Sequence, residues 1–370
     1  MMPSNKRIDL PPARPTQDPT VEQPAPEYAR WGKALKRVLL SAGARVPTIL
    51  GRISDQIAGH RGNFRLGGRR EPAPTNGSLP MMDPAALVAS INDRHGTHFR
   101  LGCPVGGGES GCTHSIFDDE GIEYILKWGE GSEFRVQQSV EIARRLRTVG
   151  YPAPDFIVSS SGNGLRYLVH RILPGTPGAA LTPALLTRLA ELNRLQEDAA
   201  SEFADGWPAR IVESIETGFP GWCLHDSLAT HSRETAAMLA ELKGTVAMVA
   251  GARWRTTDAV HFDFHTANIL VENGEVSGVV DWNSCCAGDC AFDLTTLAYN
   301  ALEDSGVATW LLDRALEVSG SAAVALYLSH MIVRQLDWSI RKHNQPTLAR
   351  FLNISRSALR LIRELRDHPR

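Results

Sequence analysis

The sequence contains no apolar stretch of the roughly 18 residues that a membrane-spanning helix requires. Its first residues, MMPSNKRIDLPPARPTQDP, also lack the apolar core of a secretory signal. Because it offers no segment for insertion or export, we expect a cytoplasmic protein without stable membrane insertion. Apolar residues make up 43% of the 370 residues, which is enough for a sizeable buried core.

Cysteine is scarce, and its spacing argues against a metal site. Three of the six cysteines cluster at 285, 286 and 290, but they lack CxxC spacing and a nearby histidine, and adjacent cysteines chelate one zinc poorly. In a large chain without an export signal, reduced thiols are expected. We therefore predict ordinary packing rather than disulfides or zinc for Cys103, Cys112, Cys223, Cys285, Cys286 and Cys290.

A strong overall charge is also missing, but the net charge of −2 conceals an asymmetry. Residues 1–80 hold 13 Lys/Arg and 6 Asp/Glu, whereas the remainder holds 26 Lys/Arg and 35 Asp/Glu. An acidic body argues against nucleic acid as a partner. It favours a cationic small molecule as substrate.

Residues 1–80 show no core-forming pattern and are predicted to be a disordered, basic and Pro-rich extension. Within them, residues 31–53 mix apolar and basic positions, so a short amphipathic helix at a membrane surface is an alternative interpretation. A regular pattern begins at Met81, where MDPAALVASINDRHG is typical of a helix.

From there the pattern predicts a small strand-rich part over residues 81–174 and a larger helical part over residues 175–370. Pro174-Gly175 marks the change, and no internal repeat is visible. The fold class predicted is therefore α+β. The elements expected in the first part are strands at about 98–103, 114–118, 122–128, 156–160 and 166–173, and a helix at 132–148.

The segment HFDFHTANILVENGEVSGVVDW, residues 261–282, carries the most chemistry. Asn273-Gly274 between two apolar runs predicts a tight β-hairpin. Asn268 precedes the first strand and Asp281 ends the second, so both should meet near the open end of the hairpin. Asp263 lies in the loop just before, which places a carboxylate beside two oxygen ligands.

Phosphoryl transfer from ATP requires such a set of groups. Oxygen ligands hold Mg²⁺ on the phosphates, and a separate carboxylate orients the acceptor hydroxyl. The phosphates also need positive charge and backbone N–H groups. Lys127 on the strand YILKW supplies the charge, and Glu141 in the following helix could pair with it. The glycine-rich turn VGGGESGC offers the backbone groups of Gly106, Gly107, Gly108 and Gly111.

In this order, these residues resemble the aminoglycoside phosphotransferase and choline kinase group, which are relatives of protein kinases. The resemblance rests on the glycine turn, Lys127, Glu141, the His261-x-Asp263-x4-Asn268 motif and Asp281, and covers roughly residues 90–300. Gly288-Asp289 and Asp293-Leu294 are similar to the GDPxxDLA ending of the family. Two positions depart from it: Phe262 stands where the family usually has Gly, and Trp282 replaces a common Phe.

The resemblance implies a bilobal protein-kinase-like fold that uses ATP and Mg²⁺. It assigns Lys127 to the α- and β-phosphates, Glu141 to Lys127, Asn268 with Asp281 to Mg²⁺, and Asp263 to the acceptor hydroxyl. A hinge near His170 to Leu173 would bind adenine through backbone groups, with Val169, His170 and Arg171 as the cofactor-binding residues. His261 would hydrogen-bond the loop, and Asp289 and Asp293 would brace it.

The expected acceptor is a hydroxyl of a small molecule. A cationic acceptor would find Glu303, Asp304 and Asp337 as candidate partners in the helical part, although the favoured interpretation of each is a solvated charge on a helix. Three alternatives stay open: a kinase of a metabolic hydroxyl such as choline, homoserine or a sugar, a kinase of another antibiotic class, and a nucleotide-binding pseudokinase. A protein kinase is disfavoured because the interval from Asp281 to Asp293 has no room for a long activation loop. The sequence does not specify the oligomeric state.

Overall fold

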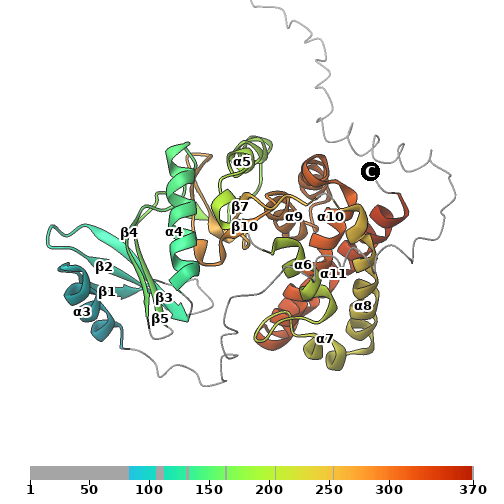
Figure 1. Cartoon of the computed structure of the whole chain (residues 1–370), viewed down its shortest axis with the longest axis horizontal. Coiled ribbons are helices and arrows are strands. Elements are labelled where there is room, and N and C mark those ends of the chain that lie inside the picture. Colours follow the sequence, from blue (N-terminus) through green and yellow to red (C-terminus); the bar gives the residue numbers. More distant parts are fainter. Residues whose placement is uncertain are drawn as a thin grey trace, which may run out of the picture. The chain divides into compact units, whose positions relative to one another are not determined.

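The computed structural model describes residues 83–105, 112–130, 133–162, 165–204, 206–252 and 254–368 (Figure 1). The predictions for residues 1–80, and for Gly106, Gly107, Gly108 and Gly111, lie outside these residues. Helix α3 (Pro84–His95) matches the helix expected after Met81. It starts at Asp83, whose carboxylate accepts the Ala85 N–H, and ends at Gly96 in the left-handed conformation that glycine tolerates.

A five-stranded antiparallel sheet follows, with strand order β1-β2-β3-β5-β4. Its inner face carries Ile116, Leu126 and Val169, which pack with Leu87 and Ile91 of α3 into a separate core. All five strands were predicted, and their boundaries moved by a few residues. The strands are β1 (Arg100–Pro104), β2 (Thr113–Phe117), β3 (Glu123–Glu130), β4 (Phe156–Gly162) and β5 (Leu165–Arg171).

Helix α4 (Glu133–Thr148) connects β3 to β4 and lies beside the sheet in Figure 1. Its buried residues Ile142, Ala143 and Leu146 belong to the main core of the helical part rather than to the small core under α3. The helix therefore links the sheet to the catalytic elements, because it also contacts the short helix η4 (Trp282–Ser284) that follows Asp281.

The remaining chain is mostly helical, as predicted. Its helices are α5 (Pro183–Leu195), η1 (Ser201–Phe203), α6 (Trp207–Glu216), α7 (His225–His231), α8 (Arg233–Gly244), η2 (Thr245–Gly251), η3 (Thr266–Asn268), α9 (Ala291–Asn300), α10 (Ser305–Lys342) and α11 (Gln345–Asp367). Helix α10 forms the centre of this part and packs against α6, α7, α9 and α11. It is long and apolar enough to resemble a membrane span, but 72% of its most apolar window is buried inside the protein, as expected of a core helix.

Two small sheets in the helical part carry the catalytic segments. One joins β6 (Thr176–Pro177), β8 (Ile269–Glu272) and β9 (Glu275–Val279), and the other pairs β7 (Asp258–Val260) with β10 (Cys286–Gly288). Gly288 lies flat against the Trp207 ring, and a Cβ there would come within 2.5 Å of it. The order of a β-rich part followed by a helical part confirms the predicted bilobal α+β, kinase-like fold.

Candidate active site

The loop that carries Asp263 is hydrogen-bonded to a buried carboxylate. Asp293, at the start of α9, accepts the backbone N–H of His261 at 2.8 Å and that of Phe262 at 3.0 Å. Gln196 of the segment after α5 donates to the same carboxylate at 2.6 Å. The prediction that Asp293 braces this loop through its backbone is confirmed. His261 is structural as expected, since its Nε2 bonds the Val280 carbonyl at 2.7 Å.

Phe262 explains its own departure from the family pattern. Its φ of 73° is in the left-handed region, which favours glycine and costs other residues roughly 1–2 kcal/mol. The ring compensates by packing, because it stacks on Phe292 at 5.1 Å and meets Trp207 edge-on. A buried aromatic ring therefore replaces the conformational freedom of glycine at this turn.

The predicted hairpin is present. Asn273 and Gly274 have φ of 52° and 83°, the two positive values that a type I′ turn requires. Strands β8 and β9 pair in register with Ile269 opposite Val279. The Val280 N–H then donates to the Asn268 carbonyl at 2.9 Å, so the residues on either side of the hairpin's open end are neighbours.

Lys127 reaches this open end from the sheet. Its Nζ lies 2.6 Å from Asp281 Oδ2, with both side chains partly exposed. Asn268 donates its amide to the Asp263 carbonyl at 2.9 Å. The structure thus brings together Lys127, Asp263, Asn268 and Asp281, which lie up to 154 positions apart in the printed sequence.

The pairing expected between Glu141 and Lys127 is wrong in this structure. Glu141 instead accepts hydrogen bonds from Arg144 and Arg145, which lie three and four positions further along the same helix, at 2.8–2.9 Å. These two guanidinium groups lower the pKa of Glu141 to about 2, although burial opposes them. Side chains three and four positions apart on a helix are within reach of one another, so Arg144 and Arg145 compete with Lys127 for this carboxylate.

The strand pairing narrows the expected hinge to its last residues. Val169, His170 and Arg171 lie within β5, which is paired on one side with β3 and on the other with β4. A strand between two neighbours spends its N–H and C=O groups on both, so these residues have no free backbone to offer adenine. The chain leaves the sheet at Ile172, and the Pro174 carbonyl accepts from Ser277 at 2.6 Å. Ile172 and Leu173, at the far end of the expected hinge, are therefore the better candidates for a backbone that binds adenine.

Asp263 has a partner that the sequence did not indicate. Arg334, in the last third of α10, donates to Asp263 Oδ1 at 2.7 Å and to the Phe262 carbonyl at 2.7 Å. Burial alone would raise the pKa of Asp263, but the Arg334 charge and the nearby His265 outweigh it and hold that pKa well below the usual range. Asp263 is consequently an ionised carboxylate at neutral pH.

The donor atoms at the open end of the hairpin fit Mg²⁺. Since the Asn268 nitrogen donates to Asp263, its amide oxygen is the atom left for a cation. Asp281 adds a carboxylate, of which Oδ2 is on Lys127. One amide and one carboxylate oxygen, with the remaining positions left to phosphate and water, are the usual protein share of a magnesium site.

The three acidic residues considered for a cationic acceptor have partners in their own chain. Glu303 pairs with Arg350, Asp304 caps the first turn of α10, and Asp337 is buried against Arg341 and Ser227. Each position was chosen for its charge alone, and the sequence did not show these partners. They do not form a site for a cation.

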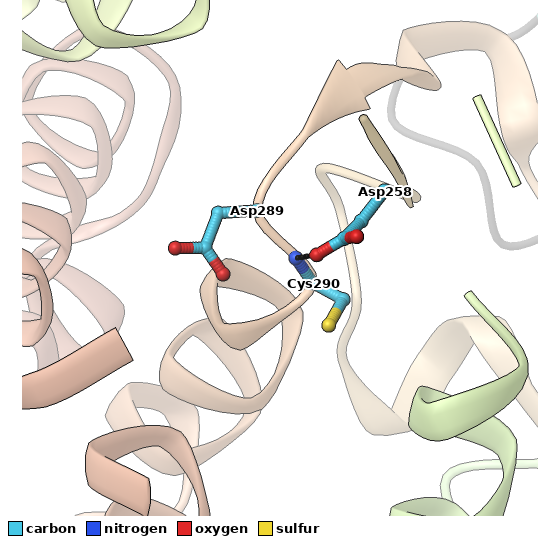
Figure 2. Close-up of side chains that lie close together, drawn as sticks. All are labelled: Asp258, Asp289 and Cys290. Atoms are coloured by element: carbon cyan, nitrogen blue, oxygen red, sulfur yellow. Dashed lines mark hydrogen bonds between the residues drawn. The ribbon is translucent and has the colours of Figure 1, made fainter. Parts of the chain in front are cut away.

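Asp258, Asp289 and Cys290 form a buried cluster at the junction of β7, β10 and α9 (Figure 2). Asp258 is held by both arms of Arg255, at 2.6 and 2.8 Å, and by the Cys290 N–H. Asp289 accepts from Ser319 at 2.6 Å and Tyr327 at 2.7 Å, so it braces α10 rather than the catalytic loop. Because hydrogen bonds already engage both carboxylates, the cluster has a structural role. All six cysteines are free thiols.

Asp289 should make stability depend on pH. Burial raises the pKa of Asp289 to about 6, despite the Ser319 and Tyr327 hydrogen bonds. The stabilisation by protonated Asp289 is therefore fully present below about pH 4, which is the pKa of an aspartate carboxyl in the unfolded chain. It is lost as pH rises through about 6. Asp289→Asn cannot ionise. Its free energy of unfolding relative to the wild type should rise between pH 4 and pH 7, by at most about 3 kcal/mol.

Urea unfolding at several pH values measures this difference. The exposed Asp93→Asn on α3 is the matched control and should run parallel to the wild type. If Asp289→Asn also runs parallel to the wild type, the carboxyl is ionised in the fold throughout this range.

A β-rich part with a lysine directed at a hairpin, and a helical part carrying the HxDxxxxN loop, define the class of kinase-like phosphotransferases. The profile of the phosphotransferase enzyme family matches residues 103–326, and the chain belongs to that family.

Solved structures with TM-scores above 0.5 agree on the fold. Aminoglycoside phosphotransferase APH(4)-Ia, in a ternary complex of a thermostable mutant with AMP-PNP and hygromycin B, is 16% identical with a TM-score of 0.56, covering 75% of this chain and 98% of its own. Its apo form is 17% identical with a TM-score of 0.54, covering 74% and 97%. Choline kinase LicA from Streptococcus pneumoniae is 12% identical with a TM-score of 0.49, covering 75% and 98%. No curated protein sequence matches the chain.

Proposed function

We propose that this protein transfers the γ-phosphoryl group of ATP to a hydroxyl of a small molecule. The observation that carries the proposal is the meeting of Lys127, Asp263, Asn268 and Asp281 at one hairpin end, with Lys127 2.6 Å from Asp281. A cation, two oxygen ligands and a separate ionised carboxylate are the groups that phosphoryl transfer requires. A pseudokinase would have no need of this complete set.

Each group has a role in the proposal. Lys127 binds the α- and β-phosphates, and the backbone of Ile172 and Leu173 meets the adenine. Asn268 and Asp281 would hold Mg²⁺, which would supply positive charge against the phosphates.

Asp263 receives the acceptor hydroxyl. The hydroxyl oxygen bonds to the γ-phosphorus, the bond from that phosphorus to the bridging oxygen of ADP breaks, and the hydroxyl proton passes through Asp263 to solvent. A loose transition state needs orientation more than a strong base, so the lowered pKa of Asp263 is compatible with this role.

The acceptor is proposed as a hydroxylated small molecule of unassigned charge. The acidic candidates Glu303, Asp304 and Asp337 are engaged elsewhere, so no described acidic group near the site supports a cation in particular. Hygromycin B and choline, which the names of the structural neighbours mention, are the first acceptors to try, together with homoserine and simple sugars.

Lys127→Ala tests the first step. The wild type should bind ATP in a Mg²⁺-dependent manner in a calorimetric titration, and Lys127→Ala should bind it more weakly and turn it over far more slowly, since the phosphates lose their cation. Lys342→Ala, an exposed lysine at the end of α10, is the control and should behave as the wild type. Absence of nucleotide binding by the wild type, with GTP tried alongside ATP, would refute the proposed function. Mass spectrometry of each acceptor then detects the added phosphate.

A further inference from the structure

Arg334 makes a two-pronged contact with the catalytic loop. One guanidinium nitrogen holds the backbone carbonyl of Phe262, and the other holds the side chain of Asp263, both at 2.7 Å. The two bonds fall on consecutive residues of the catalytic loop. A planar guanidinium has fixed angles between its donors, so it fixes the carboxylate relative to the peptide that carries it.

The peptide under this fork needs such a restraint. Phe262 is in the left-handed region, where a non-glycine backbone persists only if its surroundings impose it. Arg334 also lies over the Phe262 ring, 5.1 Å from its centre. One side chain therefore contacts Phe262 through its ring and its carbonyl, while Asp293 holds its N–H from the other side.

The fork also distinguishes the two oxygens of Asp263. Oδ1 is taken by Arg334. Oδ2 has only longer contacts, 3.4 Å from the Asn268 amide and 3.6 Å from His265 Nε2. Oδ2 is thus the weakly held oxygen, and it is the one able to accept a hydroxyl.

We infer that Arg334 is a positioning residue for phosphoryl transfer, which fixes the Phe262-Asp263 turn so that Asp263 presents Oδ2 to the acceptor. The inference rests on the proposed function. Where the family usually has glycine, this chain has a strained Phe262, and Arg334 supplies the restraint that this turn then needs. The sign of the effect is clear: without Arg334, the carboxylate can rotate, and a misplacement of about 1 Å costs on the order of 10²-fold in rate.

Arg341 offers a matched control within the same helix. It lies two turns further along α10 and pairs with the buried Asp337 through Nε and Nη2, each 2.7 Å from one oxygen of that carboxylate. Asp337 is bonded to Ser227 and has no contact with the catalytic loop among the described residues. Arg334→Met and Arg341→Met therefore remove the same chemistry from the same helix, but only the first touches Asp263.

The test measures ADP release with ATP and Mg²⁺, using hygromycin B, choline and water alone as acceptors. Arg334→Met should lower kcat roughly 10- to 100-fold, with an unchanged Kd for Mg·ATP by calorimetry. Arg334→Lys should recover part of the loss, and Arg341→Met should keep the wild-type kcat. In the background of Asp263→Asn, Arg334→Met should cost nothing further, because it acts through the missing carboxylate.

Three outcomes would overturn the inference: Arg334→Met at the wild-type kcat, equal losses in Arg334→Met and Arg341→Met, or losses that multiply in the double variant. The last two would make Arg334 a structural residue only. Absence of Mg·ATP binding by the wild type would instead refute the proposed function, and the inference with it. The nucleotide titration of each variant separates these cases, since a folded protein that binds Mg·ATP with altered kcat bears on Arg334 alone.

Discussion

Asp263→Asn is expected to bind Mg·ATP nearly as tightly as the wild type while its kcat falls roughly 10²–10⁴-fold. The substitution keeps the shape of the side chain and removes its charge. Asp263 contacts Arg334, His265 and Asn268, whereas Lys127 pairs with Asp281. The negative charge that this substitution removes is therefore not the one beside Lys127, the proposed phosphate-binding side chain. The KM for ATP should therefore change little.

Asp281→Asn is the contrasting variant and should lose nucleotide affinity, Mg²⁺ dependence and rate together. It removes a proposed metal ligand and also leaves Lys127 without its 2.6 Å partner. Calorimetry at several Mg²⁺ concentrations, combined with steady-state kinetics, separates the two patterns. Equal loss of nucleotide affinity in both variants, or near-full activity of Asp263→Asn, would show that the two carboxylates are assigned to the wrong roles.

Asp293→Ala is expected to destabilise the protein by about 3–5 kcal/mol. The carboxylate is fully buried and accepts from His261 N–H, Phe262 N–H and the Gln196 amide. Its removal leaves three buried donors without an acceptor and opens a cavity. Because two of these donors belong to the catalytic loop, kcat should fall as well.

Urea unfolding should show a lower midpoint with a similar slope for Asp293→Ala. Asp263→Asn is the comparison: it also loses the charge that pairs with Arg334, but it leaves the His261 and Phe262 N–H groups bonded to Asp293, so its midpoint should fall less than that of Asp293→Ala. Asp293→Asn should fall between, because an amide keeps the volume and one acceptor oxygen. An unchanged midpoint for Asp293→Ala would mean that water or a rearranged loop satisfies the three donors, and that the carboxylate does not hold the loop.

Several features of the site were predictable because they depend on contacts close in sequence. Asn273-Gly274 adopts two positive φ values in almost any context, so the hairpin and the meeting of its flanks followed from the residues. Asp263 and Asn268 are five positions apart in one loop, and the Asn268 amide bonds the Asp263 carbonyl. The strand that carries Lys127 and the catalytic loop were recognised from short motifs and from their order along the chain, both of which can be seen in the sequence.

Tertiary structure decided the features in which two or more partners compete. Glu141 had a distant candidate, Lys127, and two near ones, Arg144 and Arg145, and only the placement of α4 shows that the near ones hold it. The hinge depended on strand order, since β5 lies between β3 and β4 and its backbone is therefore committed. Arg334 lies 71 positions from Asp263 on an apolar helix with several arginines.

The sequence by itself therefore determined the class of fold, the hairpin and the identity of the groups at its mouth. The tertiary structure alone decided which charges pair with those groups: Lys127 with Asp281, Arg334 with Asp263, and Arg341 with Asp337. The physical reason is that backbone turns are set by the conformational preferences of adjacent residues, which the sequence lists directly. A charge pair is instead set by distance in space, and a long side chain accepts any partner of opposite sign that the packing of helices brings within reach.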